Sequence, residues 1–296
     1  MRGKILVIRG GAIGDFILTL PAIAALRRRF PGARIELLGY PHIAQLALAA
    51  GLVDAVQPIE APALAGFFAE GGTLAEHLAD YFSEFDVILS YLFDPDEVFR
   101  GNVARVAPAQ FITGPHRPDE AQQRHATEVY LQPLERLAIF EADPVPRLEI
   151  APEPLPDAPL ALHPGSGSPR KNWPEAKWRE LLPKLADAIP QTLLLVGGEA
   201  EGDRLERLAA GLPTHRVAVA SNLALSRLAA RLRGCCGFVG HDSGITHLAA
   251  AVGLPCLVLW PGTPMAVWAP DALASTPAVR RHFAALAARA CGRRRR

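Results

Sequence analysis

The chain has 296 residues, of which 50% are apolar and 21% charged, with a formal net charge of +1. This length accommodates two domains of ordinary size, and the composition is globular rather than disordered or fibrous. The near-neutral balance excludes bulk electrostatic attraction to nucleic acid, so no nucleic-acid partner is expected.

The apolar pattern near the start predicts a buried strand, a glycine turn and a helix. Residues 4–9 form a short apolar run typical of a strand covered on both faces. Glycines at 10–14 follow, and an amphipathic helix is expected over 16–30. Strand-like and helix-like runs then alternate to about residue 140, which indicates parallel β-α units. The weak pattern over 61–72 predicts a mobile loop.

A proline-rich, acidic stretch over 141–159 is the predicted linker, because it has no sustained period. It gives an N-terminal domain at 1–145 and a C-terminal domain at 146–296. Strands of the second domain are expected at 160–163, 192–196, near 217, 237–240 and 256–260, and helices at 174–189, 202–211, 223–232, 246–252 and 277–290. The expected fold class is α/β, with two Rossmann-like βαβ domains facing across a cleft at their strand ends.

The cysteines and the N-terminus favour a cytoplasmic location. The four cysteines (Cys235, Cys236, Cys256 and Cys291) lack metal-ligand spacing, as suits a reducing compartment. The N-terminus leads directly into a strand, without the apolar core and cleavage site of a secretory signal. No apolar run reaches the ~18 unbroken residues that a membrane-spanning helix needs. We therefore expect a cytoplasmic chain that is at most peripheral to a membrane.

The first glycine turn contains Gly11 and Gly14 and is followed by Asp15. In the Gly-x-Gly-x-x-Gly register the first glycine would fall on Arg9, and no acidic residue ends the second strand, which argues against nicotinamide binding. Asp15 has two interpretations. It is a helix N-cap worth ~1 kcal/mol, or it is a general base beside glycines that let a substrate approach closely.

A second loop, over 163–173, follows a predicted strand and precedes a helix. Ser166 and Ser168 supply hydroxyls, Gly167 frees the backbone, and Arg170 and Lys171 supply positive charge. Such a loop suits a diphosphate, although it lacks the Gly-Lys-Ser/Thr ending of a Walker loop. Lys171 taken alone would equally suit a solvated surface position.

A third loop, over 241–247, connects a buried strand-like run to a helix. Its backbone N–H groups and helix dipole offer a seat for phosphate. Asp242 and Ser243 are good helix N-caps, and His241 and His247 add groups that exchange protons. The two histidines are six residues apart, off the spacing that places two zinc ligands on one helical face, so no metal is assigned.

In this order and at these distances, the three loops resemble those of the family 9 glycosyltransferases, the ADP-heptose:lipopolysaccharide heptosyltransferases of GT-B fold. The resemblance spans nearly the whole chain. The motifs that carry it are Lys4-Ile-Leu-Val-Ile-Arg9, Gly14-Asp15, Leu20-Pro21, His163-Pro-Gly-Ser-Gly167, Lys171-Asn-Trp-Pro174, Trp178, Asp242-Ser-Gly-Ile-Thr-His247, Gly253-Leu-Pro255 and Pro261-Gly-Thr263. The last motif departs from the Phe/Tyr-Gly-Pro-Thr pattern common in the family, and the acceptor-side segment 61–72 carries no motif.

The resemblance implies a role for each matching residue. Asp15 is the general base, with Gly11 and Gly14 in the acceptor-side loop, and Lys171 contacts the donor diphosphate and shares in catalysis. The remaining donor-binding residues are Ser166, Gly167, Asp242, Ser243, Gly244 and His247, with Glu199 or Glu201 meeting the donor ribose. No cofactor is implied. The partners are a nucleotide-sugar donor and a saccharide or lipid-linked saccharide acceptor.

The implied reaction is an inverting, metal-independent transfer of a sugar, with Asp15 taking the proton of the acceptor hydroxyl. Because a carboxylate repels phosphate, Asp242 is expected to orient His247 or nearby N–H groups. Two other classes of protein remain as alternatives to a glycosyltransferase: a nucleotide-sugar-binding protein without turnover, and an oxidoreductase. The run Arg27–Arg29 suits a helix C-terminus, the favoured interpretation, or contact with anionic lipid at the inner membrane.

Overall fold

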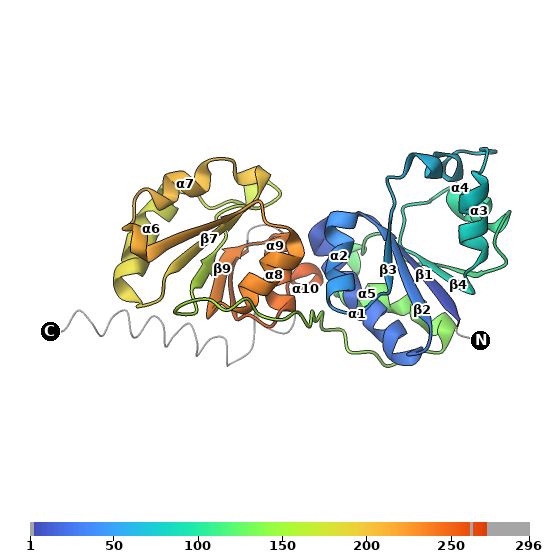
Figure 1. Ribbon diagram of the computed structural model, residues 1–296, viewed down its shortest axis with the longest axis horizontal. Helices are drawn as coiled ribbons and strands as arrows, with labels where there is room; N and C mark the ends of the chain where they lie inside the picture. Colours follow the sequence, from blue (N-terminus) through green and yellow to red (C-terminus); the bar gives the residue numbers. More distant parts are fainter. Residues whose placement is uncertain (1–2, 261–262, 271–296) are drawn as a thin grey trace. The chain divides into compact units, whose positions relative to one another are not determined.

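The computed structural model describes residues 3–260 and 263–270. The chain divides into two compact units, Met1–Pro146 and Arg147–Arg296. In the described part each unit is built on a five-stranded parallel sheet flanked by helices (Figure 1). The expected α/β class and the two Rossmann-like βαβ units are therefore confirmed. The helix predicted over 277–290 lies outside the described residues.

The first unit has the strand order β3-β2-β1-β4-β5, with every neighbouring pair parallel. Its strands are β1 (Lys4–Arg9), β2 (Arg34–Gly39), β3 (Ala55–Pro58), β4 (Val87–Ser90) and β5 (Gln110–Thr113). Its helices are α1 (Ile13–Arg29), α2 (Pro41–Ala49), α3 (Glu76–Ser83), α4 (Val98–Ala104) and α5 (Ala126–Leu131), with the 3-10 helices η1 (Pro62–Phe68), η2 (Glu120–Gln122) and η3 (Gln132–Leu137). Helix α1 packs against α2 and α5, and η1 packs against α4.

The second unit repeats this arrangement, with the order β10-β9-β6-β7-β8 and parallel pairing throughout. Its strands are β6 (Leu160–Leu162), β7 (Leu193–Gly197), β8 (Val217–Ser221), β9 (Gly237–His241) and β10 (Cys256–Leu259). Its helices are α6 (Glu175–Ala188), α7 (Arg204–Ala209), α8 (Leu225–Arg233), α9 (Gly244–Ala251) and α10 (Met265–Trp268), with the 3-10 helices η4 (Pro169–Lys171), η5 (Glu199–Glu201) and η6 (Thr214–Arg216). Helices α6 and α7 pack together, as do α8 and α9.

Each sheet has one place where the direction of the crossovers reverses. In the first unit it lies between β1 and β4, and in the second between β6 and β9. The loops that leave two such neighbouring strands diverge to opposite faces of the sheet and open a crevice at the carboxyl edge, where ligands of doubly wound folds bind. The two reversal points are therefore the first places to look for a functional site.

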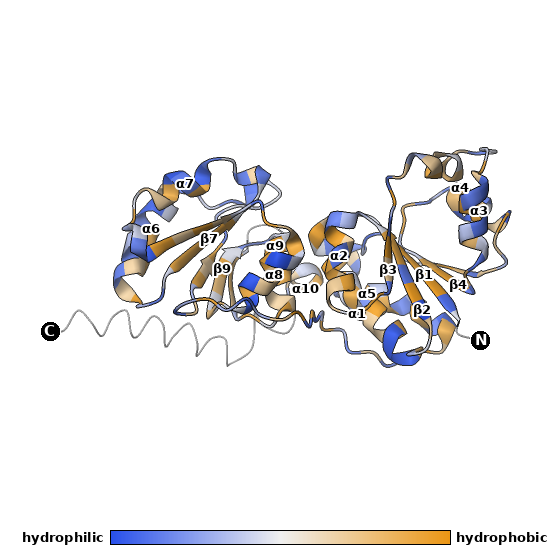
Figure 2. Ribbon diagram, viewed as in Figure 1, coloured by the Kyte–Doolittle hydropathy of each residue, from blue (hydrophilic) through white to orange (hydrophobic). Residues whose placement is uncertain are grey.

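Apolar side chains on both faces of the strands hold each sheet between its helices. Strand β1 is buried from Ile5 to Arg9, as a strand covered on both faces requires. Figure 2 shows the strands of both sheets mainly in hydrophobic colours. Large, fully buried rings anchor the helices, among them Phe82 in the first unit and Trp178 in the second. Within the described residues, no helix is long and apolar enough to cross a membrane.

The prediction of a mobile loop over 61–72 is wrong. Residues 62–68 form η1, and Phe67 within it is fully buried in the core of the first unit. The side-chain amide of Asn102 donates to the carbonyl oxygens of Phe67 at 3.0 Å and Ala69 at 2.8 Å. The segment is ordered by a residue more than thirty positions away, which its weak local pattern does not reveal.

The predicted linker is tied down over its second half. Between η3 and β6 the structure has no helix or strand, as the proline content suggests. However, Leu148 is buried and its N–H donates to the Ala251 carbonyl oxygen at 2.9 Å, while the Glu153 N–H donates to Ala230 at 2.8 Å. These bonds attach the segment after residue 146 to the second unit.

Candidate functional site

The reversal point of the second unit gathers polar side chains from three loops. His163 directly follows β6, Glu201 lies in the loop after β7, and Asp242 directly follows β9. All three side chains are buried, although they lie at the edge of the sheet. Burying charged and polar groups is favourable only where they bond to one another. Their partners therefore define the site.

Lys171 and Asp242 form an ion pair in this cluster. The Lys171 ammonium lies 2.5 Å from Oδ2 of Asp242, which also accepts a hydrogen bond of 2.7 Å from the Thr263 hydroxyl. The lysine side chain is about a third exposed and the carboxylate is buried. Asp242 is thus bonded to Lys171 and Thr263, two partners that the sequence did not predict for it. The pair neutralises Asp242 and leaves two ammonium protons of Lys171 available to a ligand.

Of the two predicted N-caps of α9, Ser243 is confirmed and Asp242 is wrong, because Asp242 lies one residue before the cap. The Ser243 side chain accepts a bond from the Thr246 N–H at 3.3 Å, and its hydroxyl lies 3.3 Å from Nδ1 of His163. The helix begins at Gly244. Ser243 accepts from the N–H groups of Thr246 and His247, which leaves those of Gly244 and Ile245 without an intrahelical partner. These groups and the helix dipole favour an anion here. His247 is buried one turn further along the helix.

His241 ties two of the loops together. Its Nδ1 lies 3.1 Å from the Gly165 carbonyl oxygen, and its Nε2 accepts a bond of 2.9 Å from the Trp173 N–H. A carbonyl only accepts and an amide only donates, so the ring is neutral with its proton on Nδ1. Burial lowers the pKa of this imidazole, which agrees with a neutral ring. His241 lies in the predicted loop over 241–247 but is not among the site residues that the family resemblance implies. The structure makes it a residue that holds the loops in place.

Glu201 lies directly beneath the 163–171 loop. Its Oε2 accepts a bond of 2.7 Å from the Gly198 N–H, and its Oε1 lies 3.7 Å from Nε2 of His163. Burial alone would raise the pKa of this carboxyl, but His163 and the Gly198 N–H outweigh it and hold the pKa below its ordinary value. A Cβ on Gly165 would meet Oε1 at 1.8 Å, so this position requires glycine. Glu199, by contrast, is exposed.

The other two predicted loop residues face different surroundings. The Ser166 hydroxyl donates to the Ser168 carbonyl oxygen at 2.7 Å and is buried, so it holds the loop closed. Gly167 is exposed, and a Cβ built there would meet no atom within 4 Å. The space above Gly167 is therefore open to a ligand.

The reversal point of the first unit holds Asp15, three residues into α1 after the N-cap Ala12. Asp15 does not cap the helix, because α1 begins earlier, where Gly11 turns the chain with a φ of +99°. The Asp15 side chain is half-buried, as is Gly14. Within residues 3–260 and 263–270 its carboxylate has no hydrogen-bond partner. This acid is thus open to a ligand, unlike Asp242 and Glu201.

A buried arginine lies under Asp15, which sequence reasoning did not identify. The Arg9 guanidinium donates to the backbone oxygens of Asp15 at 3.2 Å and of His116 at 2.8 Å. It also stacks over the Tyr130 ring, with 4.7 Å from its Cζ to the ring centroid. Arg9 fixes the start of α1 and the loop after β5 against each other. The sequence does contain a signal for this role. Arg9 is a basic residue at the end of the apolar strand β1, and a charged residue at a buried position needs bonding partners.

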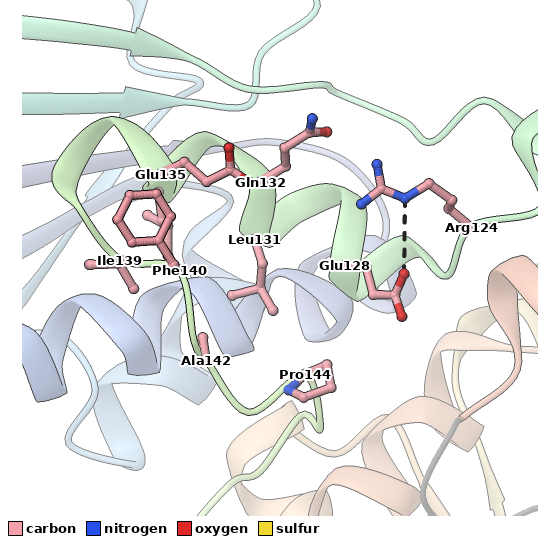
Figure 3. A pocket seen from close by; sticks show the side chains of 10 residues that line it. Arg124, Glu128, Leu131, Gln132, Glu135, Ile139, Phe140, Ala142 and Pro144 are labelled. Carbon is pink, nitrogen blue, oxygen red and sulfur yellow. Dashed lines mark ion pairs between the residues drawn. The ribbon is translucent and has the colours of Figure 1, made fainter.

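A hollow in the first unit lies away from the reversal point. It is lined by residues between 124 and 144, with Leu131, Ile139 and Phe140 on its apolar side and an ion pair from Arg124 to Glu128 at 4.0 Å (Figure 3). None of these residues belongs to a loop at the reversal point. In the part of the chain that the structure describes, no group of three or more His, Cys, Asp or Glu side chains could hold a metal ion.

Two Rossmann-like units in one chain are the architecture of the GT-B fold class. The model of glycosyltransferase family 9 (heptosyltransferase) matches residues 120–289, more than half of the chain. The chain therefore belongs to this family.

Curated relatives match over a shorter stretch. Lipopolysaccharide heptosyltransferase 1 of Pseudomonas aeruginosa is 42% identical over 90 residues, which cover 30% of this chain and 25% of that protein. Its namesake from Escherichia coli K12 is 37% identical over 90 residues, 30% of this chain and 28% of the relative. The match thus spans about a quarter of the length of these relatives.

Solved structures resemble the chain over most of its length. A family 9 glycosyl transferase from Veillonella parvula has a TM-score of 0.72 and 20% identity, covering 92% of this chain and 84% of that one. The E. coli heptosyltransferase WaaC with ADP has a TM-score of 0.69 and 22% identity, covering 90% and 89%. At this identity the likeness establishes the fold.

Proposed function

We propose that this chain transfers a heptose from an ADP-linked donor to a hydroxyl of a lipopolysaccharide-core saccharide, with inversion and without a metal ion. The observation that carries the proposal is the Lys171–Asp242 pair beside the first turn of α9, at the reversal point of the second sheet. Family membership and the names of the curated relatives support the sugar and the acceptor class. The fold match to a heptosyltransferase with ADP supports the nucleotide.

The donor diphosphate binds between Lys171 and the N-terminus of α9. Lys171 keeps two protons free when it pairs with Asp242, and the Gly244 and Ile245 N–H groups at the start of α9 are available to an anion. Gly167 leaves room for the diphosphate, and Ser166 and Ser243 hold the two loops in shape. His247 is buried in the first turn of α9, and we assign it to the same seat. This seat needs no rearrangement of the cluster before the donor arrives.

Glu201 is the residue we assign to the donor ribose, in preference to Glu199. Its carboxylate is fixed by Gly198 and His163 and kept ionised by them, so it is a preorganised acceptor for hydroxyl groups. Glu199 is exposed and would lose side-chain freedom on binding. Glutamine at position 201 should therefore weaken ADP binding more than glutamine at position 199.

Asp15 takes the proton of the acceptor hydroxyl as that oxygen attacks the anomeric carbon. Its carboxylate has no hydrogen-bond partner in the described chain and lies in the first turn of α1, beside Gly11 and Gly14. Attack from the face opposite the diphosphate inverts the anomeric configuration. Negative charge that develops on the leaving diphosphate is stabilised by Lys171 and the helix N–H groups, where a metal would otherwise serve.

The C-terminal end of α1 carries three arginines, Arg27, Arg28 and Arg29. Arg27 is occupied, since it donates to the Ala33 and Leu52 carbonyl oxygens at 3.0 and 3.2 Å and pairs with Asp54. Arg28 and Arg29 are exposed. All three arginines lie in the last turn of α1, which confirms the favoured interpretation of a helix C-terminus. We propose that Arg28 and Arg29, being exposed, also make transient contact with anionic lipid on the cytoplasmic face of the inner membrane, which would weaken as salt increases.

The test is a transfer assay with ADP-heptose, and with UDP- and GDP-linked sugars for comparison, on lipopolysaccharide from a heptose-deficient strain. We expect a product one heptose heavier by mass spectrometry, with inverted anomeric configuration by NMR and an unchanged rate in EDTA. Donor binding without any product would identify a nucleotide-sugar-binding protein without turnover. Binding of a nicotinamide dinucleotide in a fluorescence titration would indicate an oxidoreductase instead.

A further inference from the structure

Two aromatic rings meet at the surface of the first unit, where its strands end. Phe93 follows β4 and is 70% exposed, and His116 follows β5 and is also exposed. Their ring centroids are 4.6 Å apart and their planes are inclined by 61°. The two loops thus bring their rings together without burying Phe93. None of the residues assigned above to the donor or to proton transfer accounts for this pair.

The loop that carries Phe93 is held rigidly. The Asp94 carboxylate accepts bonds from the N–H groups of Phe99 at 3.0 Å and Arg100 at 2.9 Å, at the start of α4. Phe99 itself is buried in the core. Phe93 therefore projects from a fixed support, and little conformational entropy would be lost when a ligand covers its ring.

A short chain of contacts connects this aromatic pair to Asp15. The backbone oxygen of His116 accepts from Arg9 at 2.8 Å, and the same guanidinium donates to the backbone oxygen of Asp15 at 3.2 Å. Arg9 is only 3% exposed, so this link lies inside the unit. The pair and the open carboxylate therefore belong to one rigid edge of the sheet.

Apolar groups surround the glycine turn at the same edge. The side chains of Tyr40, Ile59 and Leu92 lie within 4.0 Å of where a Cβ on Gly10 would stand. They come from the loops after β2, β3 and β4. This edge of the sheet thus combines apolar side chains, the Phe93 and His116 rings, and the open Asp15 carboxylate. Such a surface suits a sugar ring, which has C–H bonds on its face and hydroxyl groups at its edge.

We propose that the exposed Phe93 ring, against which the His116 ring packs at an angle, is a platform on which a pyranose ring of the acceptor saccharide stacks, so that one of its hydroxyls meets Asp15. The C–H bonds on the face of a sugar ring pack against an aromatic face, and its hydroxyls stay free to make hydrogen bonds at the ring edge. This inference rests on the proposed function, because that function supplies the acceptor. It adds the residues that recognise the acceptor.

The test compares Phe93→Ala, Phe93→Trp and a control, Phe140→Ala, which removes an equally exposed ring of the same unit. The probe is the deacylated core oligosaccharide of a heptose-deficient strain, titrated by calorimetry into protein saturated with ADP. This arrangement measures acceptor binding without turnover. Dissociation constants for ADP are measured on the same samples.

We expect Phe93→Ala to weaken oligosaccharide binding on the order of 10-fold, as loss of one stacked aromatic face implies. Phe93→Trp should restore it, because a larger ring offers the same kind of face. ADP affinity should stay within twofold in all variants, and Phe140→Ala should bind the oligosaccharide like the wild type. In steady-state assays the loss should raise KM for the acceptor with little change in KM for the donor.

Unchanged oligosaccharide affinity in Phe93→Ala, with transfer activity present, would overturn the platform and leave the proposed function standing. Loss of affinity in both Phe93→Ala and Phe93→Trp, with melting temperatures unchanged, would also overturn it, because stacking predicts recovery. A wild-type protein that binds neither ADP nor oligosaccharide and transfers nothing would refute the proposed function, and the platform with it.

Discussion

In the second unit the polar groups at the strand ends are bonded to one another, whereas in the first unit the acid at the corresponding place is open. His163 follows β6 and meets Ser243 and Glu201, and Lys171 meets Asp242. After β1, the topological counterpart of β6, the Asp15 carboxylate has no hydrogen-bond partner within the described chain.

The difference shows that loops with different side chains adapt the same sheet topology to two different chemical roles. A closed network is suited to hold a charged ligand in one place, since its groups need not reorganise. An unpaired carboxylate is suited to exchange a proton with a substrate. Fold alone would not distinguish the two units, and their loops do.

The substitution Asp15→Asn is expected to have the largest effect of those that test this comparison. Asparagine keeps the shape of the side chain and removes the base, so kcat should fall by roughly 10²–10⁴-fold. ADP affinity should not change, because Asp15 belongs to the first unit and the donor seat to the second. The measurement is single-turnover kinetics with calorimetric titration of ADP. Full activity in this variant would remove Asp15 from the chemistry.

Lys171→Ala tests the closed network by opening it. Removing the ammonium deletes a diphosphate contact and leaves the buried Asp242 charge unpaired, so kcat/KM should fall by about 10²–10³-fold. Adding Asp242→Asn should recover part of the ADP affinity, because it removes the repelling carboxylate. Lys177→Ala is the matched control, as Lys177 is exposed on α6 and pairs with Glu180. A kcat/KM within threefold of wild type for Lys171→Ala would contradict this role.

Local patterns were sufficient to predict the alternating βαβ units and the three glycine-containing loops, because period and turn chemistry are written in short stretches. They failed where distant residues decide the outcome. Segment 61–72 is ordered by Asn102, and Asp242 pairs with Lys171, 71 positions away. The start of α1 was misplaced because Gly11 turns the chain before Asp15 is reached.

Gly165→Ala tests how closely the second network is packed. The new Cβ would stand 1.8 Å from Oε1 of Glu201, so the loop or the carboxylate must move, at a cost of about 1–3 kcal/mol in unfolding free energy. Gly167→Ala is the control two residues away, since its Cβ would meet nothing within 4 Å. Urea denaturation measures both variants. Equal stability of the two would show that Glu201 does not pack against the loop as described.

His241 supplies the smallest expected effect, a dependence of stability on pH. Burial lowers the pKa of the folded-state imidazole below its ordinary 6.5, so below pH 6.5 the unfolded chain binds a proton that the folded chain does not. The contribution of His241 to the free energy of unfolding should therefore be largest above pH 6.5. It should decrease as pH falls toward the folded-state pKa, with a slope of at most about 1.4 kcal/mol per pH unit. His241→Asn should flatten this part of the profile, whereas the exposed His215→Asn should not. A wild-type stability that is level between pH 6.5 and 5 would mean that protonating Nε2 costs the folded state nothing. The bond from the Trp173 N–H to a neutral ring, which ties the two loops, would then be wrong.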